Sequence, residues 1–76
     1  MTVIPSLSYK KTVSALQRAG FVVGWQTESH IHMVRRTPTG ERIGITVPAY
    51  KPVPRFLLAK IIKQACLTLE EFQSYL

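Results

Sequence analysis

The chain has 76 residues, enough for one small domain over residues 1–76 and too few for two lobes with a cleft between them. Hydrophobic residues make up 46% of it and charged residues 18%, which excludes an intrinsically disordered chain. Ten basic residues against four acidic ones give a net charge of +6, so we expect an anionic partner: nucleic acid, an anionic membrane or an acidic protein.

The first predicted helix follows an extended lead-in over residues 1–7 and begins near Ser6 or Ser8. Either serine can act as the N-cap, because its hydroxyl can accept a hydrogen bond from the first helical turn. Apolar residues then recur at helical spacing and form one stripe: Tyr9, Val13, Leu16 and Ala19. Gly20 stands where a left-handed residue would end the helix.

Three strands are predicted next, over residues 21–26, 30–36 and 42–47, with polar turns between them. Such short turns favour an antiparallel meander, because parallel neighbours need a long crossover. Strand alternation places Ile31 and Met33 on the face toward the core, and His30 and His32 on the opposite face.

The second predicted helix runs from about Pro54 to Ala65, after a proline-rich connection over residues 48–54. Proline fits the first turn of a helix, where its missing N–H costs nothing. Thr68 and Glu71 have the spacing of a capping box, which predicts a short last helix. Apolar residues that can pack that helix on the body are Leu69, Phe72 and Leu76.

The expected order is therefore α-β-β-β-α with a short third helix. Two amphipathic helices can cover the apolar face of a three-stranded antiparallel sheet. This is an α+β fold of the double-stranded-RNA-binding-domain type, with its helices on one face. Because both apolar stripes are committed to the sheet, and no apolar stretch is long enough to span a bilayer, we expect no membrane partner.

The single cysteine, Cys66, cannot form an intrachain disulfide, which fits a reducing cytoplasm, where we expect the protein to reside. We interpret Cys66 as a small packing residue, because free cysteine is usually buried and inert. One cysteine and two histidines cannot fill a tetrahedral zinc site, so we expect no metal and no cofactor.

The basic residues gather on the two long helices and around the second hairpin. The N-terminus of the second helix adds a positive dipole end beside Lys51 and Arg55, which suits a phosphate. Helix periodicity alone explains the same pattern equally well as a solvated helix face.

His30 and His32 lie two residues apart on one strand, which puts their Cα atoms ~6–7 Å apart on one face. An imidazole can take the proton from an RNA 2′-hydroxyl or give one to the leaving 5′-oxygen near neutral pH. The spacing alone, however, favours two half-exposed strand histidines without chemistry. A metal site is weaker still, because only Glu28 lies near enough to complete it.

Several short segments, taken in order, carry a family resemblance. They cover residues 5–8 ahead of a basic helix, 16–21, 26–30, 46–48, 61–68 and 70–72. The ordered set resembles the HicA-type toxins, which are the small mRNA interferases of HicAB toxin–antitoxin pairs. It extends over nearly the whole chain.

The resemblance implies metal-independent cleavage of mRNA, and a HicB-type antitoxin that binds and blocks the toxin. It maps the catalytic histidine of the family onto His30. Ser29 would orient the turn or donate a hydrogen bond, and His32, which has no counterpart in the motif, is kept as a second accessory residue. The residues expected to hold RNA phosphates are Lys10, Lys51, Arg55 and Lys60.

Two departures from the family pattern matter for function, while Cys66 in place of a glycine is a structural change at a helix end. Glu28 replaces the glycine before Ser-His, and Pro54-Arg55 replaces a Gly-Thr-like pair at the start of the second helix. The charge of Glu28 would repel phosphate. Glu28 therefore keeps open the alternative of a non-catalytic RNA-binding or antitoxin-binding module with the same fold.

Overall fold

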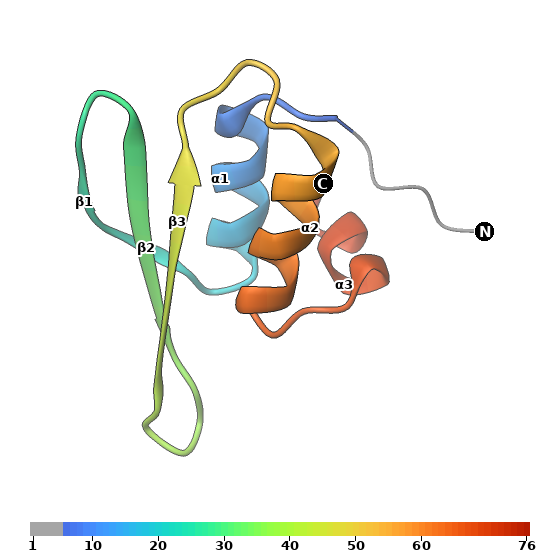
Figure 1. Ribbon diagram of the computed structural model, residues 1–76. Coiled ribbons are helices and arrows are strands. Elements are labelled where there is room, and N and C mark those ends of the chain that lie inside the picture. Colours follow the sequence, from blue (N-terminus) through green and yellow to red (C-terminus); the bar gives the residue numbers. More distant parts are fainter. Residues whose placement is uncertain (1–5) are drawn as a thin grey trace.

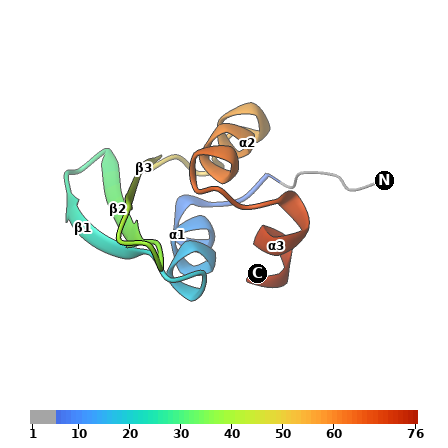
Figure 2. The same cartoon turned by 90° about the horizontal axis from the view of Figure 1, so that it is seen from below.

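The computed structural model describes residues 6–76, so residues 1–5 of the expected lead-in lie outside the described part. Its elements are α1 (Tyr9–Arg18), β1 (Val22–Gln26), β2 (His30–Arg36), β3 (Arg42–Pro48), α2 (Arg55–Gln64) and α3 (Leu69–Ser74). The strands form one antiparallel sheet in the order β1-β2-β3. All three helices lie on the same side of this sheet, with α3 farthest from it (Figures 1 and 2). The predicted α+β fold is confirmed.

The core fills the space between the sheet and the helices. As predicted, Ile31 and Met33 of β2 face the helices, and they pair across the strands with Val47 and Ile45 of β3. The helices contribute the other side of the core, chiefly Ala15, Leu16, Leu58, Ile61, Ile62, Ala65 and Phe72. The opposite face of the sheet is left uncovered, and we call it the open face.

The two long helices begin at the same end of the molecule. An isolated bridge joins Leu7 to Val53, and each of these residues lies two positions ahead of a helix. Ser8, not Ser6, is the N-cap of α1 and accepts a hydrogen bond from the Lys11 N–H at 3.4 Å. Pro54 is the N-cap of α2, one residue ahead of the predicted first turn. Both helices therefore point their N-termini to one edge (Figure 1).

Two strand boundaries and the packing of one residue differ from the predicted ones. Phe21 lies ahead of β1 and is buried in the core, whereas β1 itself is exposed along its length because it projects beyond the helices. β3 extends one residue further, to Pro48. Leu76, expected to pack on the body, lies beside α1 but stays 46% exposed and outside the core, because it follows the C-cap of α3 at Tyr75.

Cys66 is exposed, so its interpretation as a buried packing residue is wrong. Its φ is +59°, and it follows Ala65, the C-cap of α2. The Cys66 N–H donates to the Lys63 carbonyl and the Leu67 N–H to the Ile62 carbonyl. This is the Schellman pattern, which turns the chain at a left-handed residue and directs the side chain outward. Gly20 ends α1 in the same way.

We expect Cys66→Gly to raise the free energy of unfolding by about 0.5–1 kcal/mol, because glycine adopts the left-handed region without a Cβ clash. Urea unfolding followed by circular dichroism measures the change. Gly20→Ala is the matched control and should destabilise; a Cβ there would meet nothing closer than 3.6 Å, so its cost is backbone strain alone. A Cys66→Gly protein no more stable than the original would contradict the prediction.

The predicted capping box begins α3. The Thr68 N–H donates to Glu71 Oε1 at 2.9 Å, and the Glu71 N–H donates to Thr68 Oγ1 at 3.1 Å. The hydrogen bond from the Thr68 backbone, followed by that of its side chain, lowers the pKa of the Glu71 carboxyl below its ordinary 4.5. The folded protein therefore binds this proton less tightly than the unfolded chain does.

This difference predicts a loss of stability in acid. Because the pKa of Glu71 is lower when folded, the capping carboxylate stabilises the protein fully above about pH 4.5. That contribution is lost as the pH falls through the lowered value. Urea midpoints between pH 6 and pH 3 should drop more steeply for the original protein than for Glu71→Gln, which keeps an acceptor but does not titrate. Equal slopes for the two proteins would contradict the prediction.

Candidate active site

His30 lies at the tip of the β1–β2 hairpin. The Thr27 N–H donates to the His30 carbonyl at 2.8 Å, and the His30 N–H donates to Thr27 Oγ1 at 3.2 Å. These bonds close a short turn over Glu28 and Ser29. The His30 side chain is exposed. The backbone is therefore held in place while the imidazole stays accessible to a ligand.

Ser29 holds the His30 ring. Its Oγ lies 2.9 Å from His30 Nδ1, which leaves Nε2 without a partner within residues 6–76. The Ser29 carbonyl also accepts a hydrogen bond from the Ala49 N–H at 2.8 Å. The tip is thereby joined to the chain that follows β3.

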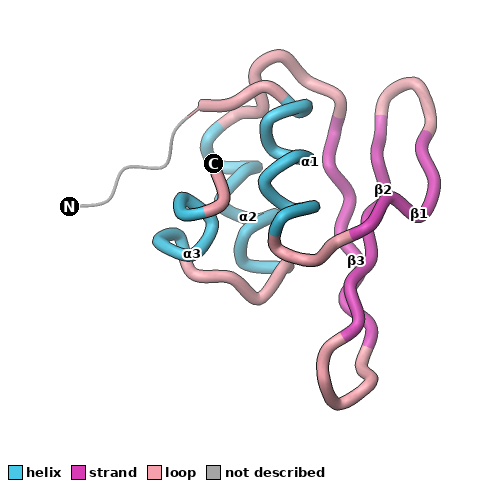
Figure 3. The backbone as a smooth tube through the Cα atoms, turned by 180° about the vertical axis from the view of Figure 1, so that it is seen from behind, coloured by secondary structure: helices cyan, strands magenta, loops and turns pink. Residues whose placement is uncertain are grey.

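The segment that follows β3 also contacts the start of α1. The Tyr9 N–H donates to the Tyr50 carbonyl at 3.1 Å, and Lys51 Nζ lies 5.6 Å from the centroid of the Tyr9 ring. Lys10 follows Tyr9 and is exposed. Figures 1 and 3 show the β1–β2 turn, the 48–54 loop and the first turns of α1 and α2 at one end of the molecule. We call this end the helix-start edge.

The helix-start edge is electropositive. Arg55 begins α2, and Pro54 provides no side-chain cap, so N–H groups of the first turn are left for an outside acceptor. Lys60 lies five residues further on, which is ~7.5 Å along the axis and about 140° around it. The structure therefore gathers Lys10, Lys51 and Arg55 at this edge and leaves Lys60 along the helix.

Glu28 adds one acid to the same end of the molecule, in the β1–β2 turn (Figure 1). It is exposed in the turn next to Ser29, and no basic side chain of the described residues forms an ion pair with a glutamate. The left-handed residues in the described part of the chain are Gly20, Gly40 and Cys66. Glu28 therefore occupies its turn without left-handed strain, and its carboxylate charge stays uncompensated.

His32 lies on the open face with His30, as alternation predicts, but in different surroundings. Its Nδ1 lies 3.0 Å from Thr46 Oγ1, and its ring stacks on Trp25 with the centroids 3.6 Å apart and the planes 21° apart. Its imidazole is thus fixed by two neighbours, whereas that of His30 has one.

The sequence pattern alone assigns no functional role to Trp25. Simple alternation from Val23 would put its side chain on the core face. A bulge between Val23 and Trp25 shifts the register by one residue, so that Trp25 pairs with His32 on the open face. Gly24, inside the bulge, was the signal in the sequence.

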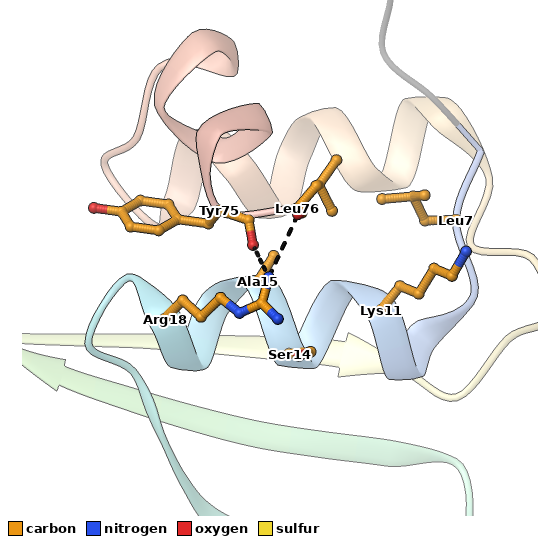
Figure 4. A pocket seen from close by; sticks show the side chains of 7 residues that line it. All are labelled: Leu7, Lys11, Ser14, Ala15, Arg18, Tyr75 and Leu76. Carbon is orange, nitrogen blue, oxygen red and sulfur yellow. Dashed lines mark hydrogen bonds between the residues drawn. The ribbon is translucent and has the colours of Figure 1, made fainter.

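A hollow of about 370 Å³ lies elsewhere, between α1 and the C-terminal residues (Figure 4). Arg18 Nη1 in it donates to the Tyr75 carbonyl at 2.9 Å and to the Leu76 carbonyl at 3.4 Å. Arg18 is therefore occupied in holding the end of the chain. None of the predicted site residues lines this hollow.

Among residues 6–76, no three His, Cys, Asp or Glu side chains gather as metal ligands. None of the helices in that range is long and apolar enough to cross a membrane. A comparison with protein families matches residues 9–67 to the family described as the HicA toxin of bacterial toxin–antitoxin. The matched range holds the hairpin tip and both long helices and ends before α3. A search of curated proteins found no match.

Proposed function

This chain belongs to the HicA toxin family of bacterial toxin–antitoxin systems, and on that premise we propose that it is an endoribonuclease that cleaves mRNA. His30 acts as its general base or general acid, and a HicB-type antitoxin binds and blocks it. The observation that carries the proposal is the exposed His30 imidazole, held through Nδ1 by Ser29 at an electropositive edge.

The proposed reaction is an attack of the RNA 2′-oxygen on the adjacent phosphorus. A bond forms from the 2′-oxygen to phosphorus, and the bond from phosphorus to the 5′-oxygen breaks. The products are a 2′,3′-cyclic phosphate and a 5′-hydroxyl. Nε2 of His30 either takes the proton from the 2′-hydroxyl or supplies a proton to the leaving 5′-oxygen. Water carries out whichever of these two proton transfers His30 does not. Since an imidazole moves protons near neutral pH, no metal step enters the proposal.

The cations of the helix-start edge have a separate role in this proposal. Lys10, Lys51 and Arg55 hold phosphates and stabilise the charge that develops on the reacting one. The α2 N-terminus adds its dipole and its free N–H groups at the same place. Lys60, further along α2, would contact RNA away from the cleaved bond.

The products test this mechanism. Single-stranded RNA with a labelled 5′ end is incubated with the purified protein and a chelator. We expect fragments ending in 2′,3′-cyclic phosphate, and no cut where a single 2′-deoxynucleotide replaces the attacking one. Intact RNA would overturn the ribonuclease proposal, and a cut at the deoxy position would overturn the 2′-oxygen attack.

Glu28 favours a second candidate, a module of the same fold that binds RNA or an antitoxin without cleaving. We expect Glu28→Gln to speed cleavage by about 3- to 10-fold, which corresponds to about 1 kcal/mol of repulsion between unit charges near a surface. Glu41→Gln, in the other hairpin turn, is the matched control and should leave the rate unchanged. Binding without cleavage by both the original protein and Glu28→Gln would support the non-catalytic module.

A further inference from the structure

Beyond the His30–Pro48 pair at the hairpin tip, the open face of the sheet carries three further cross-strand rows, defined by the pairing of β1, β2 and β3. They are Trp25–His32–Thr46, then Val22–Val34–Gly44, then Arg36–Arg42. Successive rows lie two residues apart along the strands, or ~7 Å. An aromatic row and a cationic row are thus separated by a row of small or aliphatic residues.

The side chains of the aromatic row, Trp25–His32–Thr46, are held in place and are also accessible to a ligand. Thr46 holds the His32 ring, and His32 supports one face of the Trp25 indole. Trp25 is nevertheless 56% exposed. Because His32 covers one face of the indole, the exposed area of Trp25 includes its other face, which is open to the solvent. We call the stacked pair the platform.

A hollow of about 270 Å³ lies beside the platform, and its lining includes Trp25, His32, Arg42 and Gly44. Gly44 leaves room there, because a Cβ at that position would meet nothing within 4 Å. A flat ring can therefore approach the strand backbone between the platform and Arg42.

The cationic row is a pair of like charges. Arg36 and Arg42 lie directly opposite each other, an arrangement that destabilises a sheet. No glutamate of the described residues forms an ion pair with either. An anion between them would remove the repulsion.

We infer that the open face binds single-stranded RNA, with an unstacked nucleobase on the Trp25–His32 platform and a neighbouring phosphate on Arg36 and Arg42. Aromatic stacking combined with cations that follow the backbone is how proteins hold single strands. A duplex does not fit, since its bases are stacked and paired. The inference rests on the proposed ribonuclease function and specifies its substrate.

The position of His30 connects the platform to the reaction. His30 lies two residues from His32 on β2, so its Cα is ~6–7 Å away and its side chain shares the open face. A base on the platform would bring an adjacent phosphate toward His30 and the helix-start edge. The platform would thus select which phosphodiester is cut.

Trp25 is the only tryptophan of the chain, so its fluorescence reports on the platform directly. We expect a single-stranded RNA octamer to quench this fluorescence saturably in His30→Ala, which prevents cleavage of the probe. The same octamer paired with its complement should quench far less. By fluorescence anisotropy of a labelled octamer, Trp25→Ala should bind about 5- to 100-fold more weakly, and Trp25→Phe should restore most of the affinity.

Two further variants complete the test. Phe56→Ala removes an aromatic ring that is 67% exposed on α2, and its affinity should match that of the parent. Arg42→Gln should lower the slope of log affinity against log salt by about one, whereas Lys63→Gln, near the end of α2, should not.

The outcomes separate this inference from the proposed function. If RNA is cleaved but does not quench the Trp25 fluorescence, or if Trp25→Ala and Phe56→Ala lose RNA affinity equally, the platform does not bind RNA. Either result leaves the proposed ribonuclease function intact. Quenching without cleavage by the original protein supports the platform and overturns the ribonuclease. Quenching by a HicB-type antitoxin but not by RNA assigns the open face to protein and overturns the inference.

Discussion

Replacing His30 with alanine is expected to slow RNA cleavage by about 10²- to 10⁴-fold, the usual contribution of a general acid or base. The protein should fold normally, because the side chain is exposed and its ring bonds only to Ser29 among residues 6–76. Single-turnover rates with labelled RNA measure the loss, and circular dichroism checks the fold. A variant that cleaves at the original rate would remove His30 from the mechanism.

Two neighbouring variants sharpen this experiment. Ser29→Ala removes the hydroxyl that holds Nδ1, so it should lower kcat by a smaller factor than His30→Ala does. His32→Ala removes the support of Trp25, so it should raise KM more than it lowers kcat. An equal loss of kcat in His30→Ala and His32→Ala would instead indicate that both imidazoles move protons.

In cells, growth arrest by the original chain should disappear with His30→Ala.

Phe72→Ala is expected to unfold the protein at 25 °C. Phe72 is fully buried in α3 and belongs to the main core. Replacing a buried phenylalanine with alanine costs about 3–5 kcal/mol, as much as a core of this size usually provides in total. The loss of the far-ultraviolet helical signal, or of dispersed amide resonances, measures the effect.

Leu76→Ala is the matched control, because Leu76 is exposed and its loss should change stability by less than about 0.5 kcal/mol. The comparison is informative because α3 lies outside the range matched to the family, residues 9–67. A Phe72→Ala protein that unfolds cooperatively with nearly the original stability would show that α3 is an appendage. The expected result makes α3 a required part of the fold.

The sequence by itself determined the features that depend on local interactions. Alternation around Ile31 and Met33 predicted which face of β2 is buried. The spacing of Thr68 and Glu71 predicted the capping box, and Gly20 the end of α1. Each of these reflects a preference of a few consecutive residues, so the order of elements and the fold class followed from them.

Only the tertiary structure decided what lies together. The Leu7–Val53 bridge and the hydrogen bond from Ala49 to Ser29 bring two helix starts and the hairpin tip to one edge, although they are distant in the chain. A one-residue bulge turns Trp25 to the open face, where simple alternation fails. These outcomes depend on pairing between separate strands and on close packing, neither of which is encoded in the periodicity of any single segment.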